Sequence, residues 1–210
     1  MSYIGTQPNN VKENIGLYTP NEILQLEKDG NWGGSIELIE RQTFSSVSSV
    51  IFDEIKEDIY DVHYITIDNF QQDGADNYGM RWLLSNDGGS SYETSNYQMA
   101  YFNLTSAGSA TDNKDTSRNH FQQTVVSADK DTDATSRGGG FIYMYNAGNS
   151  SKYTLQTNQS YSEGTAIGLA WGGASYDVAE TIDAFKFDDF GTGYNMWGTI
   201  TLYGVKQWVI

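Results

Sequence analysis

Cysteine is absent from the 210 residues of this sequence. This absence excludes disulfide bonds, thiolate metal sites and cysteine nucleophiles, so the fold must be stable without covalent cross-links. Proline is nearly absent as well, with 2 residues, and basic side chains are few: 12 against 27 acidic ones, a net charge of −15. Because such a chain repels phosphate backbones and anionic membranes, we expect no nucleic-acid partner.

Long apolar runs are also missing. The longest apolar patches, such as residues 166–171, are far too short to span a bilayer. The opening residues, MSYIGTQPNNVKENI, contain neither the basic nor the apolar region of a secretion signal. We therefore expect no membrane insertion, and synthesis in the cytoplasm.

What the sequence does contain is typical of many short strands joined by tight turns. It has 22 glycines and 15 tyrosines, and it is rich in serine, threonine and asparagine. Alternation of apolar and polar residues predicts strands near residues 35–44, 47–53, 60–69, 80–85, 97–104, 121–128, 140–145, 153–157, 166–171, 183–187 and 197–205. The segments between these strands do not show the spacing of helices that connect parallel strands. We therefore predict an all-β fold, an antiparallel jelly-roll-like β-sandwich.

The first residues differ from the rest. Residues 1–18 are polar and lack any sustained period, which predicts an extended N-terminal arm that must dock on another surface. Thr19, Pro20 and Glu22 then match a capping box with proline at the first helical position, and we expect one short helix ending by Gly30. We predict two parts, the arm 1–18 and a β-sandwich domain 19–210 that includes this helix.

The stretch 184–205 contains two runs with strand alternation, one around Phe185 and Phe187 and one around Ile200 and Leu202. The connector between them contains two glycines, which take positive φ at low cost. We therefore predict a hairpin whose four apolar side chains face the core.

Several stretches match patterns found at both ends and in the centre of one group of proteins. They are residues 2–8 (SYIGTQP), 16–32, 64–67, 84–92 and 198–206 (GTITLYGVK). On these motifs the chain resembles bacteriophage virion structural proteins of the tail-fibre or head-decoration type. The motifs cover about half of the chain and are structural signatures rather than active-site signatures. They indicate a structural component of a virion and do not indicate an enzymatic activity.

The resemblance implies a non-enzymatic component on the tail or capsid surface, made in the host cytoplasm and without a cofactor. It implies docking on other virion proteins through the arm, to which we assign Tyr3, Ile4 and Pro8 as anchoring residues. It also implies a homo-oligomer, with a trimer favoured, that meets the host surface. Whether this part belongs to the tail or the capsid stays open.

Asp129, Asp131 and Asp133 occupy the first, third and fifth positions of a calcium-binding loop. The remainder of the pattern fails, because Ala134 stands where the loop needs glycine and Gly140 stands where it needs glutamate. We interpret residues 129–133 as a solvated acidic loop and expect no metal site, although calcium in another geometry stays open.

No arrangement of carboxylates or histidines predicts catalysis. Glu37 and Glu40 lie three apart in a strand and should point to opposite faces, while Asp188 is expected in the loop of the final hairpin. His63 alternates with its neighbours in a strand and is expected on the sheet surface; His120 has no partner spaced for zinc. We expect no catalytic residues, which leaves a hydrolase as a minor alternative.

Aromatic residues alternate with other side chains in strands, as in Phe141, Tyr143 and Tyr145. One interpretation is a half-buried sheet face with tyrosine hydroxyls at its rim, and the other is a surface on which sugars stack. Tryptophans such as Trp171 are expected to be core or interface anchors. The second interpretation keeps a host-surface glycan as a candidate ligand and a free carbohydrate-binding module as the alternative function.

Overall fold

The computed structural model describes residues 19–28, 35–73, 80–123, 135–163, 166–189 and 193–206. The chain divides into two units, Met1–Ser35 and Ile36–Ile210. Tyr3, Ile4 and Pro8, which were predicted to anchor the chain, and the whole predicted arm lie outside the described residues.

Helix α1 (Pro20–Lys28) in the first unit begins as predicted. The Thr19 backbone N–H donates to Glu22 Oε2 over 2.6 Å, and the Glu22 N–H donates to Thr19 Oγ1 over 3.3 Å. These reciprocal bonds satisfy backbone donors that a helix start otherwise leaves unpaired. The predicted capping box is confirmed.

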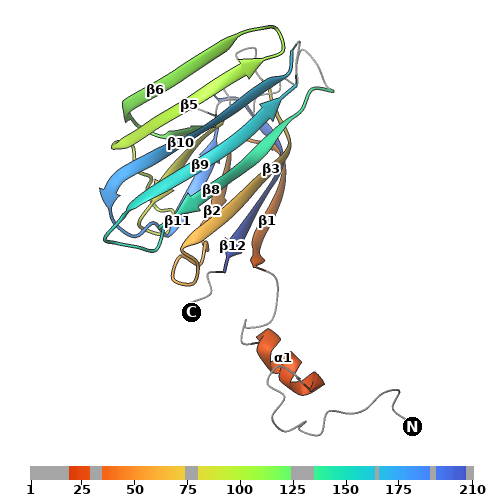
Figure 1. Ribbon diagram of the computed structural model, residues 1–210, viewed down its shortest axis with the longest axis vertical. Helices are drawn as coiled ribbons and strands as arrows, with labels where there is room; N and C mark the ends of the chain where they lie inside the picture. Colours follow the sequence, from red (N-terminus) through yellow and green to blue (C-terminus); the bar gives the residue numbers. More distant parts are fainter. Residues whose placement is uncertain are drawn as a thin grey trace, which may run out of the picture. The chain divides into compact units, whose positions relative to one another are not determined.

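The second unit is built from strands alone within its described residues (Figure 1). The strands are β1 (Ile36–Val47), β2 (Ser49–Phe52), β3 (Val62–Gln72), β4 (Met80–Ser85), β5 (Tyr97–Thr105), β6 (Ala110–Arg118), β7 (Phe121–Gln123), β8 (Gly138–Tyr145), β9 (Tyr153–Ser162), β10 (Gly168–Ala179), β11 (Ala184–Asp188) and β12 (Met196–Val205). An eight-stranded sheet has the order β1-β12-β3-β8-β9-β10-β5-β6, and a four-stranded sheet has the order β2-β11-β4-β7. All the strand pairs are antiparallel.

The order of the strands is that of a jelly roll with two added hairpins. Without β5, β6, β9 and β10, one sheet has the order β1-β12-β3-β8 and the other β2-β11-β4-β7. When these eight strands are counted from 1 to 8 along the chain, the orders become 1-8-3-6 and 2-7-4-5, which are those of a jelly roll. The hairpins β5-β6 and β9-β10 both widen the eight-stranded sheet beyond β8 (Figure 1). The predicted all-β, antiparallel, jelly-roll-like sandwich is confirmed.

The core lies between the two sheets. Trp82 on β4 is fully buried, and its ring centroid lies 5.0 Å from that of Phe121, 5.6 Å from Phe185 and 5.5 Å from Phe187. The eight-stranded sheet contributes Ile65, Ile67, Ile142, Ile200 and Leu202, all with no more than 1% of their surface exposed. Burial of this apolar surface is the main force holding the two sheets together.

The prediction of a C-terminal hairpin is half right. Phe185, Phe187, Ile200 and Leu202 are fully buried and face the core, as expected. However, β11 pairs with β2 and β4 in one sheet, while β12 pairs with β1 and β3 in the other. β11 and β12 therefore belong to different sheets, an arrangement that alternation within each strand cannot distinguish from a hairpin.

Two strands extend beyond the predicted strand ranges. No strand was predicted between residues 104 and 121, yet Ala110–Arg118 forms the polar edge strand β6. The strand predicted at 166–171 corresponds to β10, which runs on through Gly172 and Gly173 to Ala179. An edge strand that lacks an apolar face gives no alternating signal in the sequence.

The motif GTITLYGVK has a structural explanation. It forms most of β12, which lies between β1 and β3. Ile200 and Leu202 fill the core, and a Cβ atom on Gly204 would overlap the ring of Tyr60. A Cβ atom on Gly198 would lie 3.1 Å from the carbonyl oxygen of Asp68. The motif thus specifies close packing of a central strand.

His63 corrects another expectation, since it lies fully buried on the core side of β3 and not on the surface. Its Nε2–H donates to the carbonyl oxygen of Ile55 over 2.8 Å. The alternation of His63 with Tyr64 was inferred correctly, but the tyrosine faces outward and the histidine inward. Burial lowers the pKa of His63. The pKa of His120 is lowered to about 4, first by burial and then by the positive charges of Arg118 and Arg81.

The lowered pKa values of His63 and His120 predict how the stability of the fold depends on pH. A histidine in the unfolded chain has a pKa of about 6.5, so between about pH 6.5 and 4 the unfolded state binds more protons than the folded state. The free energy of unfolding should therefore fall as the pH is lowered from 7 to 5. Denaturant titrations at pH 7 and pH 5 on the wild type and on the double variant His63→Gln, His120→Asn measure this. An equal loss of stability in both proteins would contradict the assignment.

Candidate functional site

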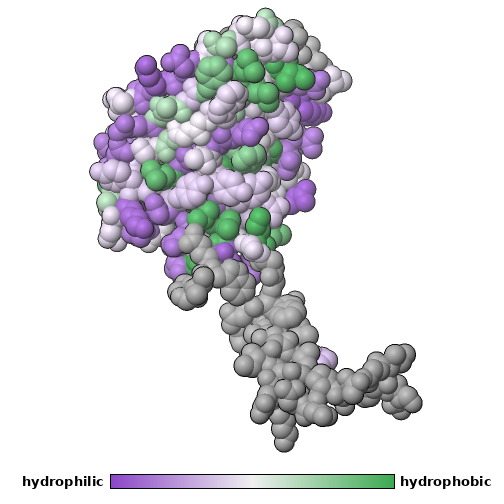
Figure 2. Space-filling model, in the orientation of Figure 1, coloured by the Kyte–Doolittle hydropathy of each residue, from purple (hydrophilic) through white to green (hydrophobic). Residues whose placement is uncertain are grey.

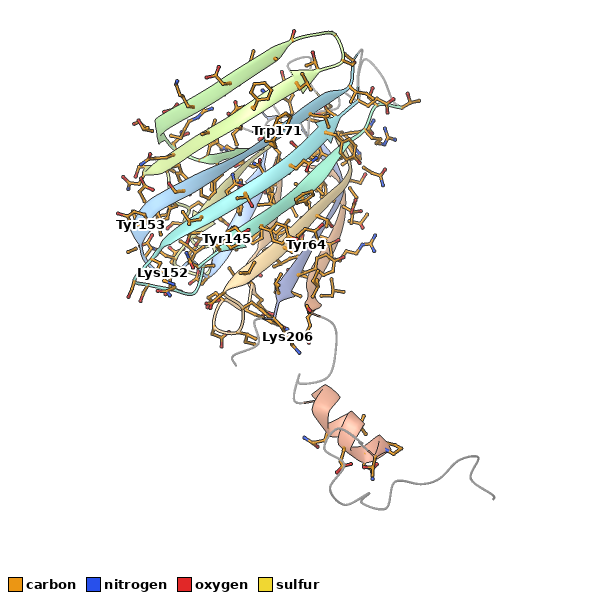
Figure 3. All side chains as sticks on the ribbon, in the orientation of Figure 1. Tyr64, Tyr145, Lys152, Tyr153, Trp171 and Lys206 are labelled. Atoms are coloured by element: carbon orange, nitrogen blue, oxygen red, sulfur yellow. The ribbon has the colours of Figure 1, made fainter. Side chains whose placement is uncertain are left out.

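The outer face of the eight-stranded sheet, meaning the side turned away from the four-stranded sheet, gathers aromatic side chains from several strands. Figure 3 shows Tyr64, Tyr145 and Trp171 on this side. Cross-strand pairing aligns two rows on it: Tyr203, Tyr64, Tyr143, Thr157, Gly173 and Ala100, then Thr201, Thr66, Phe141, Gln159, Trp171 and Phe102. Strands distant in sequence therefore build one continuous surface.

The rings on this face contact one another in two groups. In the first group the centroid of Tyr64 lies 4.8 Å from Tyr143, 5.9 Å from Tyr203 and 6.0 Å from Phe141. Phe102 and Trp171, 5.1 Å apart, form the second. Burial, together with the neighbouring tyrosines and Asp68, raises the pKa of Tyr64, so its hydroxyl stays protonated at neutral pH.

Two hollows lie on this face, and the smaller hollow, of about 290 Å³, lies beside the first aromatic group. Tyr64, Phe141 and Tyr161 are its aromatic residues, and Asp68 is the one charged residue among those that line it. A Cβ atom on Gly139 would lie 2.8 Å from the hydroxyl oxygen of Tyr161, so the tyrosine lies against the bare backbone of this glycine. The missing side chain at Gly139 therefore allows Tyr161 to stand as one wall of the hollow.

Polar groups of the smaller hollow are open to a ligand. Within the part of the chain that the structure describes, the hydroxyls of Tyr64 and Tyr161 and the amide of Gln159 have no hydrogen-bond partner. Asp68 accepts a single long bond of 3.5 Å from Thr66 Oγ1. The hollow thus combines aromatic ring surface with unused donors and acceptors.

A larger hollow of about 660 Å³ follows on β10, β5 and β6. The floor of this hollow includes Gly173 and Ala100, which pair across β10 and β5. Glycine and alanine project little above the sheet, which leaves the space open. Gln98 donates to the carboxylate of Asp177, and Ser175 donates to the same carboxylate, which holds both polar side chains at one end of this hollow. Trp171 and Phe102 occupy the neighbouring row.

The outer face is not a uniform apolar patch. Figure 2 shows weakly hydrophilic and hydrophobic residues mixed across it. Trp171, expected to be an anchor in a core or interface, has 45% of its surface exposed here. Such a mixed face fits a polar ligand with apolar ring surfaces better than it fits a second apolar sheet.

Two sets of residues singled out in the sequence lie outside the described residues: Asp129–Asp133, and Tyr3, Ile4 and Pro8. Within the described ranges, no group of three or more histidine, aspartate or glutamate side chains could hold a metal ion.

Two carboxylate expectations are wrong. A bulge between Leu38 and Glu40 shifts the register of β1, so Glu37 and Glu40 pair with Gly204 and Leu202 and lie on one side of the sheet. Bonds from Lys206 and Tyr60 lower the pKa of Glu37.

Asp188 is not in a loop. It ends β11 and is buried, and it forms ion pairs with Arg81 and, over 3.5 Å, with Lys186. Its position on β11 places it against Arg81 and Lys186, whose positive charges compensate the buried carboxylate.

Comparisons with known proteins add no assignment. No protein-family model, curated protein or solved structure matches the chain. No helix among the described residues has the length and apolar character needed to cross a membrane.

Proposed function

We propose that this chain is a non-enzymatic structural component of a bacteriophage virion, a tail-fibre or tail/capsid accessory protein. It docks on the particle through residues 1–18 and displays the β-sandwich outward for attachment to a host surface. The observation that carries this proposal is the pair of terminal motifs, SYIGTQP and GTITLYGVK, at the two ends of a jelly-roll chain. The second motif forms most of β12, which lies between β1 and β3 inside the larger sheet. Its position supports a motif that serves the fold of a structural protein.

The role of a surface component agrees with the chemistry of the domain. Glu37 is engaged by Tyr60 and Lys206, and Asp188 is engaged by Arg81, so these carboxylates serve the fold. The net charge of −15 suits a part that does not contact the packaged genome. In this proposal the protein is made in the host cytoplasm, carries no cofactor and contacts other virion proteins through Tyr3, Ile4 and Pro8.

Quantitative mass spectrometry of gradient-purified particles tests the proposal. Particles produced from the genome that encodes the chain should contain it at a fixed number of copies, in the same gradient fraction as the capsid. Recovery only in the free protein fraction would overturn the proposal.

The protein should also assemble as a homo-oligomer, with a trimer favoured. Among the described strands, β6 and β7 end their sheets, and symmetric association covers edges of this kind. Light scattering should give about three times the 23.4 kDa chain mass. A monomer, both for the isolated protein and for protein released gently from particles, would count against this expectation.

A free carbohydrate-binding module is the second candidate, and the aromatic outer face with its two hollows is the observation that favours it. The two candidates differ in location. A free module would bind sugars but would be missing from purified particles.

A further inference from the structure

We propose that the smaller hollow binds one or two rings of an uncharged glycan, which would make it the receptor subsite of the attachment protein. This inference rests on the proposed role in host attachment and names its ligand class and its site. The hollow is defined by Tyr64, Asp68, Phe141, Gln159 and Tyr161.

The aromatic residues match the apolar faces of a sugar ring. A pyranose presents C–H groups on its faces and hydroxyls around its edge, and exposed aromatic rings pack well against the C–H faces. Tyr161 keeps 46% of its surface exposed, so its ring is accessible. Tyr64 and Phe141, whose centroids are 6.0 Å apart, supply the remaining ring surface.

The polar residues match the edge of the same ring. Sugar hydroxyls both donate and accept hydrogen bonds, and the Gln159 amide offers both functions. The Asp68 carboxylate accepts strongly, and bonds to an ionised acceptor are about twice as strong as neutral ones. Because these groups have no close partner among the described residues, a ligand can use them without breaking bonds within the protein.

Charge selects among glycans. The one charged residue lining the hollow is acidic, and the chain carries a net charge of −15. An anionic sugar such as a uronic or sialic acid would place a carboxylate against Asp68 and be repelled. Hexoses and N-acetylhexosamines carry no such group, so the site favours them.

Size and continuity set the length of the ligand. A volume of about 290 Å³ is at the lower end of the range of small-molecule sites, about 300–1,000 Å³. A longer chain would leave the hollow along the row Phe141, Gln159, Trp171 and Phe102 and reach the larger hollow of about 660 Å³. Trp171, with 45% of its surface exposed, lies on this path.

The test uses the full-length protein on an array of glycans that end in neutral hexoses, N-acetylhexosamines, uronic acids or sialic acids. Neutral glycans should bind and acidic ones should not. The best neutral oligosaccharide is then titrated against Tyr161→Ala, which removes a wall, and Gln159→Leu, which removes the amide at similar volume. Each variant should weaken binding about tenfold or more.

Tyr153→Ala is the matched control, because Tyr153 is also an exposed tyrosine of β9 but does not line the hollow. It should bind like the wild type. Failure of every neutral glycan to bind, binding of acidic glycans alone, or unchanged affinity in both variants would overturn the inference. So would a change of oligomeric state in Tyr161→Ala and Gln159→Leu, because the face would then be a subunit interface.

Failure of this inference can be told apart from failure of the proposed function. If the chain is present on purified particles but binds no neutral glycan, the virion role stands and the subsite is wrong. If Tyr161 and Gln159 are needed for glycan binding but the chain is missing from particles, the subsite stands and the virion role is wrong.

Discussion

Replacing Ile200 by alanine should lower the free energy of unfolding by about 2–5 kcal/mol, because the substitution deletes buried methyl groups and leaves a cavity. Ile200 is fully buried on β12, between β1 and β3, and faces the four-stranded sheet. For a domain of this size the change corresponds to a decrease in Tm of roughly 4–20 °C. Thermal unfolding followed by circular dichroism measures it.

Ile51→Ala is the matched control for this substitution. Ile51 lies on β2 with 43% of its surface exposed, so the same loss of methyl groups there should cost far less. If the two variants unfold at similar temperatures, the placement of β12 in the core is wrong. If Ile200→Ala keeps its melting temperature but loses host binding, β12 belongs to an exposed tip.

Deleting residues 1–18 should abolish incorporation into particles while leaving the sandwich folded. Every strand that the structure describes lies in the unit Ile36–Ile210, so the deletion removes no residue from either sheet. An extended segment ahead of a folded domain can gain main-chain hydrogen bonds on a neighbouring protein, and without it these bonds are lost. Particle incorporation is measured by immunoblotting of purified virions.

The thermal midpoint of the truncated protein is the control for folding and should match that of the full-length chain. The double variant Tyr3→Ala, Ile4→Ala tests whether specific side chains carry the anchoring, and it should reduce incorporation. Truncated protein recovered on particles at the full-length level would refute the role of residues 1–18.

Features that depend on neighbours in the sequence could be predicted. The capping box at Thr19 and Glu22 needs only residues three apart, and its bonds form as expected. Alternation places Phe185 and Ile200 each on the apolar face of its strand, and because the apolar face is the one buried, their inward direction could be predicted. The jelly-roll class follows from many short strands without helical crossovers.

Features that depend on which strands become neighbours could not be predicted. Alternation separates His63 from Tyr64 but does not say which side is covered by the second sheet, so the surface position expected for His63 was wrong. A single bulge reversed the relation expected between Glu37 and Glu40.

The smaller hollow illustrates the same limit. Its residues Tyr64, Phe141 and Gln159 come from three strands that meet only through the pairing of β3, β8 and β9. The alternation around Phe141 indicated an aromatic face. It does not locate a hollow, because a hollow is a property of the assembled sheet.

Cryo-electron microscopy of intact virions tests the central claim most directly. The account predicts density for the β-sandwich on the outside of the particle, with the outer face of the eight-stranded sheet, including Tyr161 and Trp171, open to solvent. Particles that lack this density, or a sandwich whose outer face is covered by neighbouring virion proteins, would contradict it.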